Sequence, residues 1–209
     1  MTHGDTRGLR LPPAVAPVQV VVIPIYKTDQ ERATVLEVAA KVKDTLAADR
    51  IRVRVDDRDQ HRPGYKFSEW ELKGVPVRLE IGPRDVQEDR VVVVTRSNGE
   101  KRAMSTDEAV AQVDSILEGE QRSLYEQADG FRTENSYEAT AYDEIRDGLA
   151  DKGGFWAAPW CGDVACEEKI KAETRATIRV LPIDQEDPGG ACVVCGRPGT
   201  ERATWAKSY

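Results

Sequence analysis

The stretch from Val18 to Val55, VQVVVIPIYKTDQERATVLEVAAKVKDTLAADRIRVRV, decides the fold. Its first eight residues, Val18–Ile25, are mostly apolar and β-branched, which is typical of a buried strand. Thr28 and Glu31 follow at the three-residue spacing of a capping box, the signature of a helix N-terminus. This part of the stretch therefore predicts a strand followed by a helix.

The helix and the strand after it complete the unit. Arg50–Val55 alternates arginine with an apolar residue, so we expect a half-exposed strand with one basic face. Strand, helix and strand in this order form a βαβ unit, which requires parallel strands. The apolar positions of the helix recur on one face and predict its buried stripe: Val35, Ala39, Val42 and Leu46.

Further elements extend the same domain. Val75–Ile81 and Val91–Thr95 have the composition of strands, and Gly82–Asp85 predicts a turn between them. Ser105 and Glu108 repeat the capping-box spacing and predict the start of another helix. We therefore predict an α/β domain with a mixed or parallel sheet over residues 17–117. A helical linker over residues 118–150 and a small α+β domain over residues 151–209 complete the prediction.

The composition excludes several classes of protein. The chain has 209 residues, 40% of them hydrophobic and 32% charged, with a net charge of −7. This is the balance of a globular protein and not of a disordered or fibrous one. The longest apolar stretches, Val20–Ile23 and Val91–Val94, fall far short of the roughly 18–20 residues that cross a bilayer. No apolar leader follows Met1, so we expect a cytoplasmic protein with neither a membrane span nor a secretory signal.

The charge is distributed unevenly along the chain. Residues 50–84 carry nine basic and six acidic side chains, a positive excess within an acidic protein. The same segment also contains Tyr65, Phe67 and Trp70. Aromatic rings stack on splayed bases, arginine donates to guanine O6 and N7, and a carboxylate accepts the N–H groups of the guanine Watson–Crick edge. The mixture therefore favours single-stranded RNA as a partner, although the charge taken alone favours an arginine-rich solvated strand edge.

The four cysteines form two close pairs. Cys161 and Cys166 are separated by four residues, Cys192 and Cys195 by two, and glycines surround both pairs. Two pairs on separate turns suit a tetrahedral, four-thiolate zinc site, which is closed and structural. A Cys192–Cys195 redox pair is the alternative, but such motifs open a helix, and Gly196–Gly199 opposes one. Four unrelated buried thiols are a further alternative.

Three blocks resemble prolyl-tRNA synthetase of the archaeal and eukaryote-like type. The first is RPGYKFSEWELKGVPVRLEIGPRD, Arg62–Asp85, which resembles the anticodon-binding domain of that family. His3–Pro13, HGDTRGLRLPP, resembles the stretch that follows class II motif 3, so residues 1–16 would be a remnant of that region. The cysteine region and the ending Ala206–Tyr209 resemble the C-terminal zinc-binding domain.

The resemblance implies roles for individual residues. Phe67 is expected to stack on an anticodon base of tRNA(Pro) or to buttress it. The two guanines that end the proline anticodon would be contacted by Glu71, Arg78, Arg84 and Asp85. Weaker phosphate contacts are expected of Lys66 and Lys73, and the Tyr209 carboxylate is expected to approach the catalytic domain. Without RNA, Glu71 could instead pair with Arg78, and Trp70 and Leu72 are expected to be core residues.

The resemblance also sets limits on activity. Motif 1, motif 2 and the motif 3 arginine precede the matching region, so ATP and Mg²⁺ are expected only in a full-length enzyme, as is a homodimer. We expect this chain alone not to charge tRNA, and we expect no DNA partner. Met1 could be an internal methionine of a longer protein. The rival interpretations are a free-standing tRNA-binding module and a zinc-stabilised protein-interaction domain.

Overall fold

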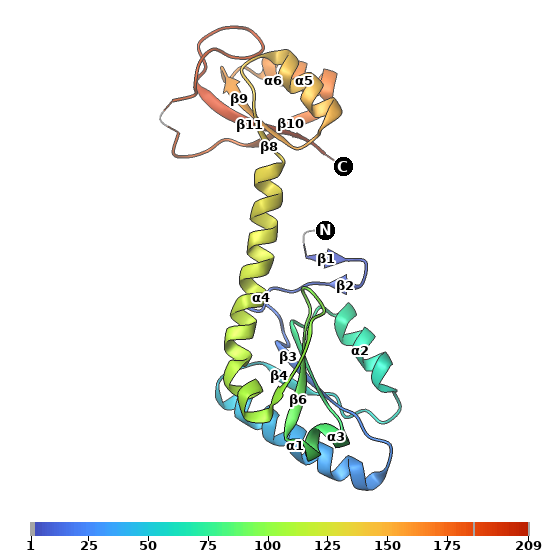
Figure 1. Ribbon diagram of the computed structural model, residues 1–209. Helices are drawn as coiled ribbons and strands as arrows, with labels where there is room; N and C mark the ends of the chain where they lie inside the picture. Colours follow the sequence, from blue (N-terminus) through green and yellow to red (C-terminus); the bar gives the residue numbers. More distant parts are fainter. Residues whose placement is uncertain (1–2, 186, 209) are drawn as a thin grey trace. The chain divides into compact units, whose positions relative to one another are not determined.

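The computed structural model describes residues 3–185 and 187–208 (Figure 1). The chain divides into two compact units, residues 1–128 and 129–209. Helix α4, Thr106–Glu134, begins in the first unit and ends in the second. Within the described ranges, no helix is both long and apolar enough to cross a membrane.

The first unit contains a short hairpin and a five-stranded sheet. The hairpin strands are β1 (Gly4–Asp5) and β2 (Gly8–Leu9). The sheet strands are β3 (Val20–Pro24), β4 (Val53–Val55), β5 (Val77–Ile81), β6 (Arg90–Thr95) and β7 (Lys101–Ser105). Besides α4, the helices are α1 (Asp29–Ala48), α2 (Pro63–Leu72) and α3 (Pro83–Gln87).

The sheet is mixed, as the sequence predicts. Its order is β4-β3-β5-β6-β7, with β3 parallel to β4 and β5, and β6 antiparallel to β5 and β7. The predicted capping box is present: Thr28 Oγ1 accepts the N–H of Glu31, and the Glu31 carboxylate accepts the N–H of Thr28. The βαβ prediction is therefore confirmed down to its helix cap.

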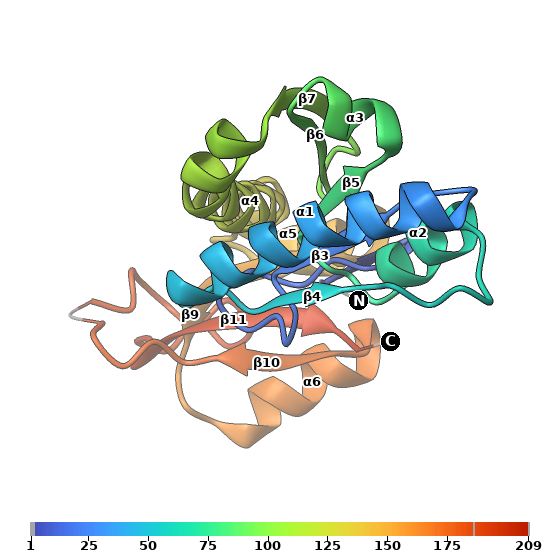
Figure 2. The same cartoon turned by 90° about the horizontal axis from the view of Figure 1, so that it is seen from below.

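The sheet buries two faces against different helices. One face packs on α1 and α4, and Figure 2 shows α1 lying along β3 and β4. All four residues of the predicted helix stripe are buried in this core. On the other face, Val21 and Ile23 of β3 pack with Trp70 and Phe67 of α2. The second cluster is smaller, and α2 carries three of the seven residues expected to contact RNA: Lys66, Phe67 and Glu71.

Three local predictions need correction. Gly82–Asp85 is not a simple turn, because Pro83 begins the short helix α3. The basic strand is only Val53–Val55, since Arg50 adopts a left-handed backbone with φ 63°. Leu72 is 60% exposed and is not a core residue, whereas Trp70 is buried as expected. β7 and the hairpin were not predicted.

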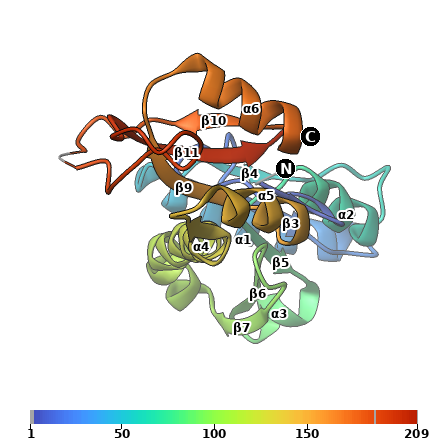
Figure 3. The same ribbon diagram turned by 90° about the horizontal axis from the view of Figure 1, so that it is seen from above.

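The second unit has a four-stranded sheet of order β10-β11-β9-β8. Figure 3 shows β9, β11 and β10 side by side, with α6 next to β10. The strands are β8 (Ser136–Glu138), β9 (Phe155–Trp160), β10 (Ala176–Val180) and β11 (Glu201–Lys207). The helices are α5 (Tyr142–Asp151) and α6 (Val164–Thr174).

The core of this unit reaches further toward the N-terminus than the sequence suggested. Ile145 and Leu149 of α5 are buried against Trp156, Ile170 and Trp205. Residues 136–150, assigned from the sequence to a helical linker, thus belong to a strand and a helix of the second unit. Residues 118–134 of the predicted linker are the C-terminal part of α4.

Candidate nucleic-acid interface and metal centre

Three cations lie in one row on the sheet face that packs against α2. Arg54 of β4 and Arg78 of β5 both pair with Val21 of β3, and Val94 of β6 pairs with Arg78 and with Lys101 of β7. Residues opposite each other in register point to the same face of a sheet. A row of positive charge therefore runs across the sheet beside α2.

The aromatic rings of α2 lie against these cations. The guanidinium carbon of Arg78 is 4.5 Å from the ring centre of Phe67, and Lys101 Nζ is 5.7 Å from it. Arg54 lies 5.5 Å from the ring centre of Trp70. Cation–π attraction of this kind restrains long basic side chains. Trp70 is buried, whereas Phe67 is only partly buried.

The two carboxylates near this row have different partners. Glu80, which is 8% exposed, accepts hydrogen bonds from Arg78 Nε at 3.0 Å and from Lys101 Nζ at 3.3 Å. Glu71 Oε1 accepts a hydrogen bond from Arg7 NH1 at 2.7 Å. The alternative of a Glu71–Arg78 pair is therefore wrong. Residues 78 and 80 are two apart on one strand and share a face, while Glu71 lies in the last turn of α2, beside the hairpin.

A hollow of about 210 Å³ opens beside the C-terminal end of α2. Its lining combines one carboxylate with several cations: Glu71, Arg7, Arg78, Arg96 and Lys101. The remaining lining residues are Val21, Trp70, Val75, Val94, Thr95 and Gly99. The structure thus brings Glu71 and Arg78 to one site, with the ring of Phe67 against the same arginine.

Arg84 and Asp85 lie beyond the other end of β5. Arg78 is near the start of this strand, so roughly 10 Å of strand separates it from α3. Asp85 Oδ2 accepts the N–H of Gly82 at 2.9 Å, and its Oδ1 accepts Arg90 Nε at 3.1 Å. Asp85 therefore fixes the first turn of α3, and Arg84 in that turn is exposed.

The two lysines predicted as weaker contacts differ sharply. Lys66 is 3% exposed, and its Nζ donates a hydrogen bond to the backbone oxygen of Asp56 at 3.0 Å. Burial lowers the pKa of Lys66. This position argues against a phosphate contact, because the ammonium faces the interior. Lys73 is accessible: its side chain is 50% exposed and its Nζ lies 4.6 Å from the ring centre of Trp70.

Sequence reasoning missed three residues of this surface. Arg54 was expected on the basic face of a strand, but its contact with the ring of Trp70 was not expected. Lys101 lies in a strand that was not predicted. The register of β6 against β7 would have placed Lys101 beside Arg78 had the strand been recognised. Arg7 carried no local signal, since its contact with Glu71 spans 64 residues.

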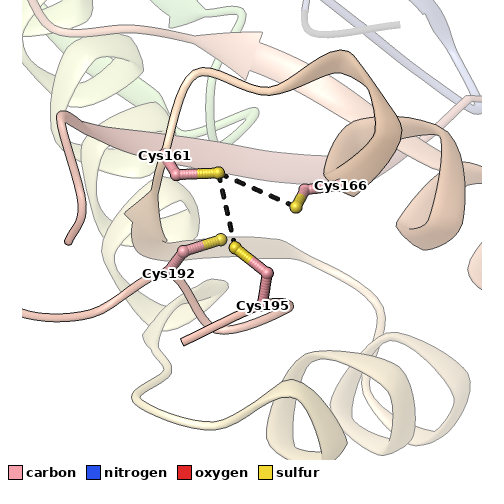
Figure 4. Close-up of side chains that lie close together, drawn as sticks. All are labelled: Cys161, Cys166, Cys192 and Cys195. Atoms are coloured by element: carbon pink, nitrogen blue, oxygen red, sulfur yellow. Dashed lines mark hydrogen bonds between the residues drawn. The ribbon is translucent and has the colours of Figure 1, made fainter. Parts of the chain in front are cut away.

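The four cysteine sulfurs meet at one place in the second unit. They all lie within 4.8 Å of one another, and Figure 4 shows them pointing together. Cys161 Sγ is 3.7 Å from Cys166 Sγ and 3.6 Å from Cys195 Sγ. Four sulfurs placed 2.3 Å from a common centre at tetrahedral corners would be about 3.8 Å apart. The donor set and its spacing therefore fit a tetrahedral metal ion.

A guanidinium lies against the sulfurs. Arg197 Nε donates to Cys195 Sγ at 3.3 Å, and its NH2 donates to Cys161 Sγ at 3.5 Å. The same NH2 pairs with the carboxylate of Asp163. Asp163 also caps α6 by accepting the N–H of Ala165 at 3.0 Å, and α6 carries Cys166. One carboxylate therefore orients both the arginine and the helix that supplies a sulfur.

The environment separates the acidities of the thiols. The hydrogen bond from Arg197 lowers the pKa of Cys195 to about 6, whereas burial raises the pKa of Cys166 to about 12. After Cys195 the chain turns and does not form a helix, which agrees with the argument against a redox pair.

Two family models match the chain. Residues 19–116 match the anticodon binding domain, and residues 142–209 match the C-terminal domain of prolyl-tRNA synthetase. The first match covers the five-stranded sheet, helices α1, α2 and α3, and the N-terminal part of α4. The second covers α5, α6, three strands of the second sheet and all four cysteines. Fold and sequence together define an anticodon-binding domain followed by a synthetase C-terminal domain.

Individual relatives agree with this class. The chain is 47% identical over its full length to a proline–tRNA ligase of Lachnospira eligens, and 46% identical over 94% of its length to one of Natranaerobius thermophilus. It spans only 43% and 40% of those two proteins. A crystal structure of prolyl-tRNA synthetase from Cryptosporidium parvum, complexed with L-proline and AMP, matches the whole chain with a TM-score of 0.88 and 36% sequence identity. The chain covers 44% of that protein.

The chain therefore belongs to the prolyl-tRNA synthetase family and corresponds to the C-terminal part of these proteins. Tyr209, predicted to contact the catalytic domain, lies outside the described residues.

Proposed function

We propose that the first unit reads the anticodon loop of tRNA(Pro) with the face of its sheet beside α2. The observation that carries the proposal is the hollow in which Glu71 and Arg78 meet, with the Phe67 ring against Arg78. A guanine offers N–H donors on its Watson–Crick edge and acceptors at O6 and N7. Glu71 supplies the acceptor and Arg78 the donor, while Phe67 supplies a stacking surface.

The remaining residues act around this centre. Lys101 and Lys73 add positive charge next to the rings, where the phosphates of a bound loop would pass. Arg84 is presented to solvent by α3, and Asp85 holds that helix in place. We assign Arg84 to the flank of the RNA loop, because it lies at the far end of β5 from Arg78.

The whole protein that contains this region is proposed to be a cytoplasmic proline–tRNA ligase. Its relatives carry that name, and the chain spans less than half of their length. ATP, Mg²⁺ and homodimer formation belong to the longer protein in this proposal. The role of this region is to select the tRNA.

The metal at the four cysteines is proposed to be zinc. Four thiolates close a tetrahedral shell and leave no open position for a substrate, so the zinc would be structural. Cys161, Cys166, Cys192 and Cys195 would hold it, with Arg197 offsetting part of the negative charge of the thiolates.

The test of RNA recognition is binding of the full chain to a synthetic anticodon stem–loop of tRNA(Pro). Arg78→Ala is expected to weaken this binding by about 1–3 kcal/mol, because a donor to guanine is lost. The loss on a stem–loop whose two anticodon guanines are replaced by adenines should be smaller. Fluorescence anisotropy at fixed salt measures both RNAs.

Arg102→Ala is the matched control. Arg102 neighbours Lys101 on β7, but it pairs with Val93 and so lies on the opposite face of the sheet. Its side chain is 64% exposed, so the variant removes the same charge without touching the proposed site. Equal losses for Arg78→Ala on both RNAs, or an equal loss for Arg102→Ala, would contradict base reading at this site.

A further inference from the structure

The hairpin of β1 and β2 is seated closely on the C-terminal end of α2. Gly8 has φ 130°, and a β-carbon there would lie 2.5 Å from Cα of Leu72. Gly74 has φ 73°, and a β-carbon there would lie 2.7 Å from the carbonyl carbon of Leu9. Glycine alone permits both approaches. The position of the hairpin is therefore fixed by backbone contacts next to Glu71.

An ion pair with a buried arginine holds the same hairpin to the sheet. Asp5 accepts two hydrogen bonds from Arg96, at 2.8 and 2.7 Å, and the Arg96 side chain is only 4% exposed. The Arg96 hydrogen bonds hold the pKa of Asp5 well below its usual range, so the pair is charged. Arg96 Nε also donates to the backbone oxygen of Glu71 at 3.1 Å. The backbone of Glu71 is thus fixed by the arginine that anchors the hairpin.

Arg7 then reaches the side chain of Glu71. The backbone N–H of Arg7 donates to Asp5 Oδ1 at 2.8 Å, and its NH1 donates to Glu71 Oε1 at 2.7 Å. Both side chains line the hollow beside α2. Within the part of the chain that the structure describes, Oε2 of Glu71 has no hydrogen-bond partner. One carboxylate oxygen is held, and the other is available to a ligand.

We propose that Arg7 is a positioning residue for Glu71 and that the hairpin is part of the guanine-reading site. A guanine presents N1–H and the N2 amino group side by side, so a carboxylate accepts both only in one orientation. The ion pair with Arg7 holds that orientation before RNA binds, which removes the cost of ordering a free side chain. The inference rests on the proposed function of Glu71, and residue 7 lies outside the matched segment 19–116.

The fold does not require this ion pair. The side chain of Arg7 is 43% exposed, and surface ion pairs of this kind contribute little to stability. The glycine contacts and the Asp5–Arg96 pair, which seat the hairpin, remain when Arg7 is changed. Arg7→Ala is therefore expected to fold with an unchanged melting temperature, and Arg7→Lys keeps the charge but not the planar donor geometry.

The experiment compares two anticodon stem–loops with the full chain. One carries guanine at both positions, and the other carries inosine, which lacks the N2 amino group. Arg7→Ala is expected to weaken binding of the guanine loop roughly tenfold and to reduce the preference for guanine over inosine. Arg7→Lys should restore part of that preference. Arg7→Ala combined with Glu71→Gln should bind no more weakly than Glu71→Gln alone, because Arg7 acts through Glu71.

The outcomes separate this inference from the function on which it rests. If Arg7→Ala weakens both loops equally, and its loss adds to that of Glu71→Gln, Arg7 contacts a phosphate and the positioning role is overturned. If Arg7→Ala changes neither loop, the role is overturned as well. If Glu71→Gln itself has no effect on a loop that the wild-type chain binds, the proposed role of Glu71 is wrong, and the inference fails with it.

Discussion

The two units prepare their sites in opposite ways. In the first unit, the charged groups of the site are already held: Glu80 binds Arg78 and Lys101, and Arg7 binds Glu71. In the second unit, four sulfurs converge on one place, and Arg197 donates hydrogen bonds to two of them. The first site is built by the folded chain, whereas in the zinc proposal the metal supplies the main attraction that holds the second site together. Removing one group should therefore have very different consequences in the two units.

The largest effect is expected from Cys166→Ser. Cys166 is 5% exposed and is carried by α6, so its loss should remove zinc and unfold the second unit. In small zinc domains, metal binding contributes on the order of 10 kcal/mol to folding. Fluorescence should change at Trp156, Trp160 and Trp205, while elemental analysis reports the metal. Binding of the anticodon stem–loop by the first unit should be unchanged.

Chelation followed by zinc re-addition to the wild-type chain is the control, because each of the four cysteines belongs to the site. The change in tryptophan fluorescence should appear when the metal is removed and reverse when zinc is added back. If the metal-free chain unfolds with the same curve as the zinc-bound chain, the metal does not stabilise the second unit, and the expected difference between the two units is wrong.

The next effect is expected from Asp56→Ala in the first unit. Asp56 is 3% exposed and accepts hydrogen bonds from Arg58 Nε at 2.8 Å and Trp70 Nε1 at 2.7 Å. Removal leaves these donors unpaired, at a cost of about 3–5 kcal/mol. Asp57→Ala is the matched control, since Asp57 is exposed. Equal chemical-denaturation midpoints for the two variants would show that the buried network does not stabilise the fold.

The same network predicts sensitivity to acid. Burial would raise the pKa of Asp56, but the hydrogen bonds from Arg58 and Trp70 outweigh it and hold the pKa below its usual range. Arg58 and Lys73 lower the pKa of Glu69 to about 2. A lowered folded-state pKa contributes stability above the unfolded value of about 4, and this stability is lost as the pH falls toward 2. Asp56→Ala should therefore flatten the acid limb of the unfolding profile.

The smallest effect is expected from Arg197→Ala. Arg197 donates to two sulfurs but is not a ligand, so zinc affinity should fall by about 10- to 100-fold while the fold persists with zinc in excess. Competition with a chromogenic chelator measures the affinity. Lys171→Ala on the exposed side of α6 removes the same charge away from the sulfurs. If Lys171→Ala lowers the zinc affinity as much as Arg197→Ala does, the loss comes from the net charge of the unit and not from the contact of Arg197 with the sulfurs.

The sequence predicted those parts of the fold that are determined by residues close together in the chain. The βαβ unit follows from the apolar run at Val20–Pro24, the cap at Thr28 and the buried helix stripe, all readable within short windows. The cysteine cluster was predictable because the spacing of the two cysteine pairs and their flanking glycines are typical of a four-sulfur metal site. Glu71 and Arg78 emerged from a motif, and the structure brings both to one hollow.

The features that the sequence did not predict involve residues that are far apart in the chain or a weak local pattern. β7, with the sequence KRAMS, is an edge strand whose side chains are mostly exposed, so it lacks alternation. Leu72 was expected in the core because it is apolar. It follows the buried Trp70 by two positions, however, which is about 200° around a helix, so the two cannot share a buried face. The Arg7–Glu71 contact has no local signature at all.

The ion pair between Asp5 and Arg96 has a practical consequence for anyone who excises this domain. Its two halves are 91 residues apart, and the segment that matches the anticodon-binding family begins at residue 19. A fragment cut at that boundary would keep a guanidinium that is 4% exposed and discard the carboxylate that neutralises it. Such a fragment would carry a guanidinium without its carboxylate partner, so recombinant versions should start ahead of residue 4.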